Sequence, residues 1–186
     1  MEIRPATASD LAQFDEIDGT IQSNRYLHLD GPGETFPAAW RLEERPLRSK
    51  LIARNALDDE ARFAVKQLLI GAEDGIALVA EHEGEAVGLA AALYEPGTGT
   101  LRVADLRVDS DFRRNGLGLA MLYQCVQAAR EAGSRAVAAR TLSNNVPAAM
   151  FLRKASFELT GFDTHRQSNH DLVKEAVTLF WYLPLL

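Results

Sequence analysis

The spacing of hydrophobic and polar residues changes along the chain close to residue 75. Before that point, apolar residues recur three or four positions apart, which is typical of one face of a helix. After it, apolar runs alternate with short turns. The elements predicted before residue 75 are a strand at Ile3, a helix that buries Leu11, Phe14 and Ile17, a loop over 26–33, and helix over 38–70 interrupted at Pro46.

The second part of the chain predicts hairpins and then a strand–helix–strand unit. Residues 76–94 predict two strands around a turn at Glu83-Gly84, and 95–99 predict another turn before a strand that ends at Val108. The elements predicted further along are a helix over 117–132 with Gly133 as its cap, a strand over 135–142, a helix over 145–155 and strands over 157–163 and 176–183. This order indicates an α/β fold with a mostly antiparallel central sheet, helices on both faces and one parallel βαβ crossover.

Length and composition narrow the class of protein. With 186 residues, of which 47% are hydrophobic and 25% charged, the chain fits one domain over 1–186 that needs no disulfide or metal. The net charge of −6 without a cluster of Lys and Arg argues against nucleic-acid binding. Cys125 is the one cysteine, and the histidines and acids match no metal-ligand spacing, so we expect no metal.

The N-terminal residues lack the basic and apolar regions of a signal peptide. The most apolar stretch, 86–94, is much shorter than the ~20 residues that a membrane helix needs. We therefore expect a soluble, cytoplasmic protein that does not bind a membrane.

The segment Arg113-Arg114-Asn115-Gly116-Leu117-Gly118 lies between a predicted strand and a predicted helix. The first turn of a helix exposes unpaired N–H groups and carries a partial positive charge, so it binds phosphate groups. Glycines there let the backbone approach a ligand closely. The dinucleotide-binding pattern needs a third glycine where this chain has Met121. The segment therefore predicts a pyrophosphate site of another kind.

Two signatures together resemble a known family. The first is Arg113-x-x-Gly116-x-Gly118 after a strand that ends in Leu106-x-Val108. The second comprises Asn145, Ala148, Phe151, Lys154 and Phe157. Both are similar to the GNAT superfamily of acetyl-CoA-dependent N-acetyltransferases, and the resemblance covers most of 76–183. It implies acetyl-CoA as co-substrate and, by analogy with other members, a homodimer.

The resemblance also implies a role for particular residues. Those implied to hold the coenzyme A pyrophosphate through backbone N–H groups are Arg113, Arg114, Asn115, Gly116, Leu117, Gly118 and Leu119. Those implied to contact the pantetheine arm are Leu106, Arg107, Val108, Asn145, Ala148 and Leu152. The N–H of Val108 would also stabilise the oxyanion that forms on the thioester carbonyl.

Two positions depart from the family pattern. Many members have, at the position of Leu152, a tyrosine thought to protonate the leaving thiolate, and a glycine at the position of Ser156. Because a thiol has a pKa of about 8.5, it can leave without an acid. We therefore expect direct attack of the amine within a ternary complex, with solvent or another residue as the acid.

Asp105 is the candidate for binding the amine and accepting its proton, since it precedes Leu106 on the strand beside the thioester. The alternative is a salt bridge with Arg102, Arg107 or Arg140. Tyr26 and Trp40 are candidates for binding the acceptor, because they fall in the N-terminal part where the family binds it.

Residues 161–183 resemble the end of streptothricin acetyltransferases, and 141–151 resemble their Thr-x-x-Asn-Asn segment. This implies a cationic small molecule with a primary amine, such as a streptothricin-type or aminoglycoside-like antibiotic or a polyamine, and a role in antibiotic resistance. Two alternatives remain. One is acetylation of a protein N-terminus or lysine, and the other is a non-catalytic sensor that binds acetyl-CoA without turnover.

Overall fold

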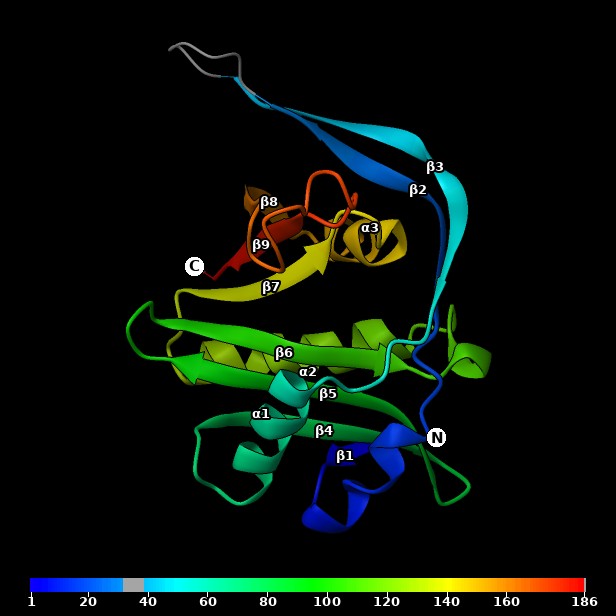
Figure 1. Ribbon diagram of the computed structural model, residues 1–186. Coiled ribbons are helices and arrows are strands. Elements are labelled where there is room, and N and C mark those ends of the chain that lie inside the picture. Colours follow the sequence, from blue (N-terminus) through cyan, green and yellow to red (C-terminus); the bar gives the residue numbers. More distant parts are fainter. Residues whose placement is uncertain (32–38, 186) are drawn as a thin grey trace. The chain divides into compact units, whose positions relative to one another are not determined.

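The computed structural model describes residues 1–31 and 39–185, which form a seven-stranded sheet and a two-stranded hairpin (Figure 1). The strand order of the larger sheet is β1-β4-β5-β6-β7-β9-β8. The strands are β1 (Glu2–Pro5), β2 (Ile21–Asp30), β3 (Arg41–Ala53), β4 (Gly75–His82), β5 (Glu85–Glu95), β6 (Thr100–Val108), β7 (Ala136–Leu142), β8 (Glu158–Asp163) and β9 (Thr178–Pro184). The helices are α1 (Asp59–Leu69), α2 (Leu117–Glu131) and α3 (Val146–Lys154), with short 3₁₀ turns η1 (Ala8–Asp10), η2 (Gln13–Asp15) and η3 (Ser110–Phe112).

The chain divides into two compact units. The first comprises Met1–Thr20, Arg54–Ala139 and Leu183–Leu186, and the second comprises Ile21–Ala53 and Arg140–Tyr182. The single domain over 1–186 stays a prediction.

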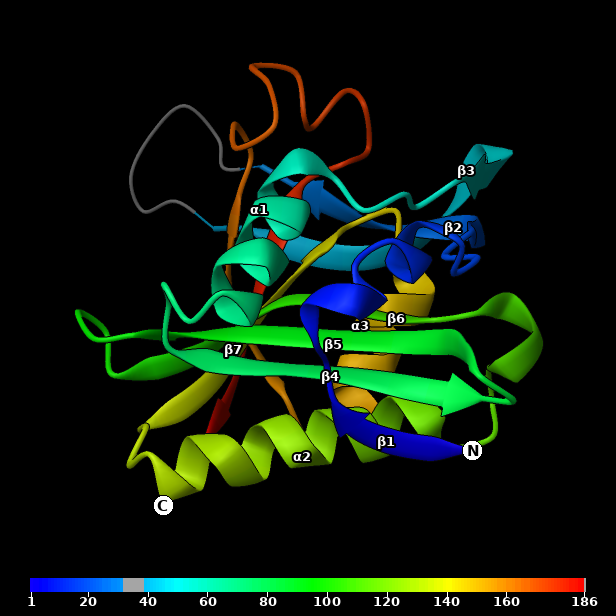
Figure 2. The ribbon, with the colours of Figure 1, turned by 90° about the horizontal axis from the view of Figure 1, so that it is seen from below.

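In the first unit, α1 and α2 cover opposite faces of the sheet formed by β1, β4, β5 and β6 (Figure 2). The core on the α1 side contains Phe14, Val65 and Leu89, all without exposed surface. On the other side, α2 buries an apolar stripe that includes Met121 and Cys125. The strands between two helical layers are rich in small apolar residues, since neither face meets water.

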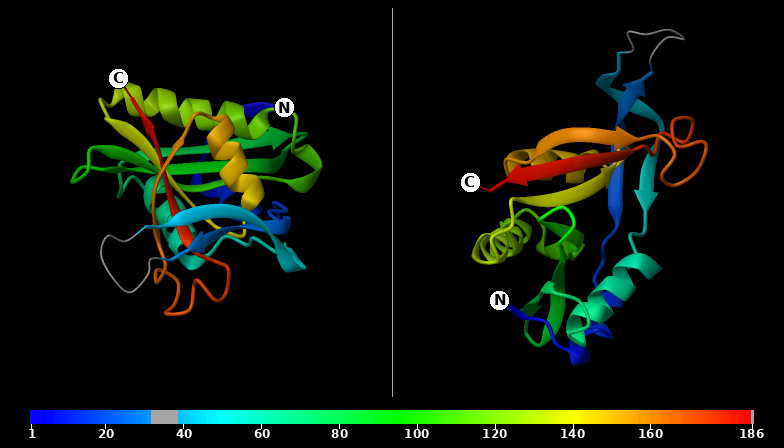
Figure 3. Two further views of the ribbon diagram at one scale, coloured as in Figure 1. Left: turned by 90° about the horizontal axis from the view of Figure 1, so that it is seen from above. Right: turned by 90° about the vertical axis from the view of Figure 1, so that its left-hand side faces the viewer.

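In the second unit, β2 and β3 pair along their length as a long antiparallel hairpin (Figures 1 and 3). The backbone N–H of Leu27 in β2 donates to the carbonyl of Ser143 at 2.8 Å. Ser143 follows β7 and precedes α3, and helix α3 packs against β2. The hairpin is thus tied to the turn that begins α3.

The structure confirms the fold predicted from the part of the chain after residue 75. The pairing of β6 with β7 is parallel, and the other described strand pairings are antiparallel. The predicted turn at Glu83-Gly84 has both residues in the left-handed region, and Gly133 follows α2 with φ 71°. Short-range signals were sufficient there because turns with glycine separate the apolar runs.

The predictions before residue 75 were largely wrong. The loop predicted over 26–33 is strand β2 as far as Asp30, and the helix predicted over 38–70 is strand β3 followed by α1. Residues 32–38 of these segments lie outside the described residues. The spacing of Leu47, Leu51 and Ile52 suits a helix, but pairing with β2 overrides this local preference. Pro46 is tolerated because β3 has a neighbour on one side, where it pairs with β2.

The predicted helix around residues 11–17 is also wrong, since η1 and η2 replace it. Its buried residues were predicted correctly, because Phe14 and Ile17 pack in the core while Leu11 is half-buried against it. No helix among the described residues is long and apolar enough to cross a membrane.

Candidate active site

Strand β6 is paired on both sides only at its start. It pairs with β5 from Thr100 to Val108, whereas its pairing with β7 is limited to Thr100–Arg102. Ala104 is an extra residue in the pairing with β5, and such a bulge bends and twists a strand. From residue 103 to 108, the described structure has no strand pairing on the side opposite β5. A free edge of this kind can bind an extended ligand as an added strand.

The pairing with β5 determines which backbone groups of β6 face the free edge. The N–H of Asp109 donates to the carbonyl of Val87 at 2.9 Å, and Val108 is opposite Gly88. Because N–H groups alternate between the two sides of a strand, those of Val108 and Leu106 point away from β5. The backbone donor proposed for the oxyanion therefore lies on the open side of the strand.

The loop after β6 leads to a helix whose N-cap is Gly116, in the left-handed region with φ 88°. Glycine adopts this conformation without strain and has no side chain to accept from the first turn of the helix. Arg114 also has a positive φ of 64°, and Asn115 Oδ1 accepts from the N–H of Leu117 at 3.2 Å. The turn so formed directs consecutive backbone N–H groups toward one region, which suits an anion.

The two arginines of the loop differ in what their side chains do. The guanidinium of Arg113 donates to three backbone carbonyls, those of Val108 at 2.8 Å, Thr20 at 2.7 Å and Asp18 at 2.9 Å. Arg114 is exposed. The side chain of Arg113 thus braces the loop, while its backbone N–H remains the group implied to contact phosphate.

Asp105 forms a buried ion pair with Arg107. Arg107 Nε and Nη2 donate to the two carboxylate oxygens of Asp105, each at 2.6 Å, and the side chains are 3% and 12% exposed, respectively. Arg107 Nη1 also donates to the carbonyl of Asn55 at 2.7 Å. Asp105 and Arg107 are opposite Ala91 and Leu89, so both lie on the face of the sheet that α1 covers.

The structure thus selects one of the three arginines considered as partners of Asp105. Arg102 instead pairs with Glu95 at 2.5 Å, and Arg140 lies over the ring of Phe180. The ion pair leaves each oxygen of Asp105 with capacity to accept from another donor. The role of Asp105 toward an amine stays a prediction.

In the second unit, Asn145 is the N-cap of α3, and its Oδ1 accepts from the N–H of Ala148 at 3.3 Å. The cap uses the amide oxygen and leaves the amide nitrogen as a donor for a ligand. Leu152 is buried at 5% exposure, in keeping with an apolar role. Ser156 has φ 67°, which explains why a glycine is common at this position in the resembling family.

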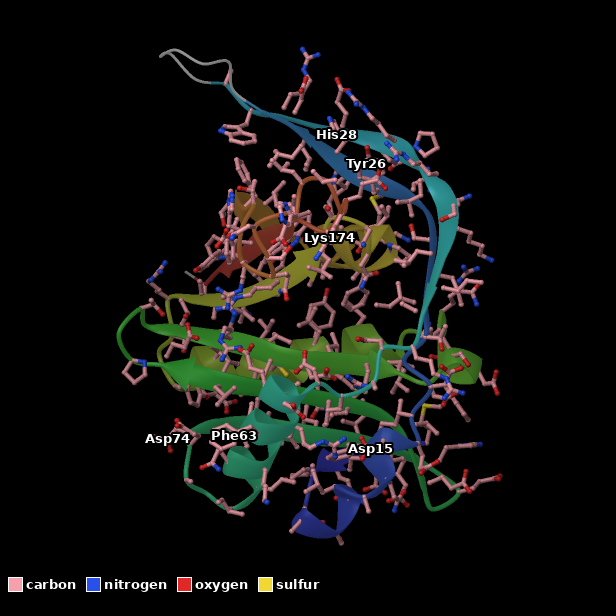
Figure 4. All side chains as sticks on the ribbon, in the orientation of Figure 1. Asp15, Tyr26, His28, Phe63, Asp74 and Lys174 are labelled. Carbon is pink, nitrogen blue, oxygen red and sulfur yellow. The ribbon has the colours of Figure 1, made fainter. Side chains whose placement is uncertain are left out.

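Tyr26 and Trp40 each have an aromatic partner that the sequence did not reveal. The hydroxyl of Tyr26 is 3.1 Å from His28 Nδ1, and the two residues neighbour each other along β2 (Figure 4). The ring of Trp40 is 4.9 Å from that of Phe162, although Trp40 remains 40% exposed. Residues i and i+2 share a strand face, a signal that could have linked Tyr26 to His28. No signal in the sequence links Trp40 to Phe162.

Nucleophilic and metal chemistry receive no support from the described residues. Cys125 is 1% exposed, and burial raises the pKa of its thiol to about 12, so it packs as a core residue. Within residues 1–31 and 39–185, no three side chains of His, Cys, Asp or Glu come together as metal ligands would.

Residues 36–157 match the model of the acetyltransferase (GNAT) family. Streptothricin acetyltransferase A of Bacillus subtilis (strain 168) is 30% identical over 80 residues, which are 43% of this chain. The match spans slightly less than half of that relative's own length, 46%.

Two solved structures resemble the whole chain. A streptothricin acetyltransferase, so described provisionally, from Bacillus anthracis str. Ames in complex with acetyl coenzyme A has a TM-score of 0.76 at 22% identity, covering 100% of this chain and 97% of its own. Nourseothricin acetyltransferase has a TM-score of 0.78 at 22% identity, covering 98% and 97%. At this identity, the likeness shows a shared fold. Together with the family match over two signatures, it means that this chain belongs to the acetyltransferase (GNAT) family.

Proposed function

We propose that this chain is an acetyl-CoA-dependent N-acetyltransferase that acts on a primary amine of a cationic small molecule. The observation that carries the proposal is the free edge of β6, which ends at a helix N-terminus without a side-chain cap. An extended arm can pair with the strand while its pyrophosphate binds the helix. Coenzyme A has this combination of an amide-containing arm and a pyrophosphate.

The backbone holds most of the coenzyme in this proposal. The pyrophosphate is bound by N–H groups of residues 113–119, and the pantetheine arm pairs with the edge of β6 from Leu106 to Val108. Asn145, Ala148 and Leu152 are proposed to contact the arm on the strength of the family resemblance. Asn145 does so through its amide nitrogen, because its oxygen caps α3.

The proposed reaction is direct attack of the amine nitrogen on the thioester carbonyl. The N–H of Val108 donates a hydrogen bond to the carbonyl oxygen on which the negative charge develops, a stabilisation of a few kcal/mol for one fixed donor. As the C–S bond breaks, the thiolate leaves with its electron pair, and the amine proton passes to solvent or to a neighbouring acceptor. Leu152 supplies no acid, which lowers the rate without blocking the reaction because the thiolate is a good leaving group.

Asp105 is proposed to orient the amine. The bidentate contact with Arg107 holds its carboxylate in one rotamer while leaving acceptor capacity on both oxygens. A carboxylate so fixed can accept an N–H bond from the attacking amine.

We predict that Asp105→Asn lowers kcat/KM for the amine about 10- to 100-fold and raises the pH optimum, because the amine loses its ionic acceptor. Steady-state rates across pH measure this. The variant also leaves buried Arg107 unpaired, which costs about 3–5 kcal/mol of stability. Glu95→Gln, which removes the acid of another Arg–carboxylate pair in the first unit, is the control. Unchanged rates at every pH would return Asp105 to a structural role.

The substrate proposal is a streptothricin-type antibiotic. It is supported by the names of the similar proteins and by the resemblance of residues 161–183. Trp40, 40% exposed beside Phe162, offers a ring to a cationic acceptor, whereas Tyr26 is buried against its neighbours.

Mass spectrometry tests the proposal directly. The protein is incubated with acetyl-CoA in three separate reactions, which contain streptothricin, spermidine or a peptide with a free N-terminus as the acceptor. We expect streptothricin to gain the mass of one acetyl group, with stoichiometric release of coenzyme A. Modification of the peptide alone would favour a protein acetyltransferase. Acetyl-CoA binding without any product would favour the sensor.

A further inference from the structure

The β2–β3 hairpin is joined to the first unit by two short segments. Residues 18–20 precede β2, and residues 54–55 follow β3. We call these segments the first and second foot of the hairpin. Both feet belong to the first unit, so their contacts with β6 and its loop lie within one compact body.

Arg113 and its neighbours hold the first foot. The guanidinium of Arg113 donates to the carbonyls of Asp18 and Thr20 as well as to that of Val108. The backbone N–H and the hydroxyl of Ser110 donate to Asp18, at 3.1 and 2.9 Å, and the N–H of Asp18 donates to the carboxylate of Asp109 at 2.9 Å. The first foot is therefore connected to the end of β6 and the loop after it by five hydrogen bonds, and the bond from Arg113 to Val108 ties that loop to the strand.

Arg107 holds the second foot. Its Nη1 donates to the carbonyl of Asn55, and its other two donors hold Asp105. The feet also touch each other, because a Cβ on Gly19 would lie 2.6 Å from the oxygen of Asn55 and 3.5 Å from Arg107 Nη1. Glycine at 19 is required for this approach. The two feet thus lie side by side against β6.

The same two arginines belong to the backbone proposed to bind the coenzyme. Arg107 lies between the free N–H groups of Leu106 and Val108, and Arg113 begins the pyrophosphate loop. Their backbones face the proposed cofactor, while their side chains hold the two ends of the hairpin. The hairpin carries Tyr26 on β2, and Trp40 immediately precedes β3.

From these contacts we propose that Arg107 and Arg113 are positioning residues that couple the cofactor strand to the acceptor-binding hairpin. The inference rests on the proposed function and names the contacts that would make the affinity for the acceptor depend on bound acetyl-CoA. Acetyl-CoA bound along β6 fixes the backbone from Leu106 to Arg113, and the arginine side chains pass that restraint to both feet. Acceptor binding is then stronger after acetyl-CoA than before it.

Arg113 is the better residue to change, because its side chain is exposed and its loss leaves no buried charge unpaired. Arg113→Ala keeps the backbone N–H for the pyrophosphate and removes the two side-chain bonds of Arg113 to the first foot, while those of Ser110 and Asp109 remain. Arg113→Lys keeps the charge but loses the planar fork that contacts three carbonyls. Arg62→Ala is the matched control, since Arg62 is an arginine of the same unit that binds Asp15 at the surface.

Two measurements separate this inference from the proposed function. Calorimetry gives the dissociation constant of acetyl-CoA, and steady-state kinetics give KM and kcat for the acceptor. We expect Arg113→Ala to lower kcat/KM for the acceptor about 10- to 100-fold, mainly through KM, with acetyl-CoA affinity within about threefold of the unmodified protein. Arg113→Lys should recover part of this loss, and Arg62→Ala should show none. A parallel loss of acetyl-CoA affinity, or an unchanged acceptor KM, would overturn the inference.

Hydrogen–deuterium exchange tests the coupling even if no acceptor is found. We expect acetyl-CoA to slow exchange in residues 18–30 and 41–55 of the unmodified protein, and this protection to disappear in Arg113→Ala while that of α2 remains. Equal protection of the hairpin in both proteins would refute the coupling. Failure of the unmodified protein to bind acetyl-CoA would instead refute the proposed function. In that case, faster exchange of the hairpin in Arg113→Ala than in the unmodified protein, both without ligand, would still support the contact of Arg113 with the first foot.

Discussion

Helices α2 and α3 each follow a strand of the central sheet, β6 and β7, but their N-termini are built differently. At the β6–α2 junction, the N-cap is Gly116, which offers no side-chain acceptor. At the β7–α3 junction, the N-cap is Asn145, whose own amide oxygen accepts from the first turn. At α2, Asn115 Oδ1 accepts from the N–H of Leu117, and the N–H groups of Gly118 and Leu119 remain for an external anion. At α3, Asn145 accepts from the N–H of Ala148 and Pro147 has no N–H, so fewer donors remain. The comparison therefore favours α2 over α3 for the proposed pyrophosphate site.

Both junctions are nonetheless braced by side chains. At the first, Arg113 donates to three carbonyls. At the second, the buried hydroxyl of Ser143 accepts from the N–H of Val177 at 3.0 Å and donates to the carbonyl of Glu175 at 3.1 Å. These bonds hold the first junction to the segment that precedes β2 and the second junction to the segment that precedes β9.

Gly118→Leu should have the largest effect on the first junction. We expect acetyl-CoA binding to weaken at least about 100-fold, because a side chain in the first turn of α2 keeps the pyrophosphate from the backbone. Helix propensity favours leucine over glycine by about 1 kcal/mol, so the helix should persist. Calorimetry checks the affinity and thermal melting checks the fold. Ala120→Leu is the control, because Ala120 is an exposed residue of α2 two positions further along. A folded variant with normal affinity would contradict the pyrophosphate assignment.

Gly116→Ala and Gly133→Ala form a matched pair at the two ends of α2. Both glycines have positive φ, and an added Cβ would meet no atom within 4 Å at either. Each substitution should therefore cost about 1–2 kcal/mol of stability through backbone strain. We expect only Gly116→Ala to weaken acetyl-CoA binding, about tenfold, since only that end of α2 lies in the proposed pyrophosphate site. Equal affinities would show that the conformation of Gly116 does not matter for binding.

At the second junction, Asn145→Asp and Asn145→Ala separate capping from ligand contact. Aspartate retains the cap oxygen and suits the helix dipole, so its melting temperature should match that of the unmodified protein, whereas alanine should lose about 1 kcal/mol. Both lack the amide donor, so both should raise the KM of acetyl-CoA, by up to about tenfold. If neither variant changes this KM, Asn145 acts as a cap alone.

The smallest effect is expected at Ser156, which follows α3 in the left-handed region. Ser156→Gly should stabilise the protein by about 1 kcal/mol and leave the kinetics unchanged, because the strain there does not involve a ligand. Chemical denaturation measures the gain. Ser134→Gly, at a residue outside the left-handed region, should give no gain. A loss of stability in Ser156→Gly would mean that the serine side chain makes a favourable contact.

The sequence predicted the elements after residue 75 and failed for much of the part before it. Strands β4, β5 and β6 are separated by tight turns, so neighbouring segments pair with each other and local signals suffice. Strand β3 instead depends on β2, and the spacing of its residues Leu47, Leu51 and Ile52 suits a helix. The bias that makes 38–70 look helical is real, but cross-strand hydrogen bonds outweigh it.

The chemistry divides in the same way. The turn glycines 84 and 133 and the burial of Cys125 could be predicted, because backbone conformation and burial on a helix face follow from a few neighbouring residues. The contacts of Arg107 and Arg113 with the two feet could not, because the acceptors are carbonyls of residues 52 to 95 positions away in sequence. Carbonyls are also present in every residue, so no residue type marks them.

The sequence alone therefore determined the α/β class, the two signatures and the loop that suits a pyrophosphate. The tertiary structure decided that β6 leaves β7 after Arg102, that Asp105 pairs with Arg107, and that two arginines hold both ends of one hairpin. The reason is physical. Local conformation depends on interactions within a few residues, whereas a free strand edge or a buried ion pair exists only once distant segments have packed.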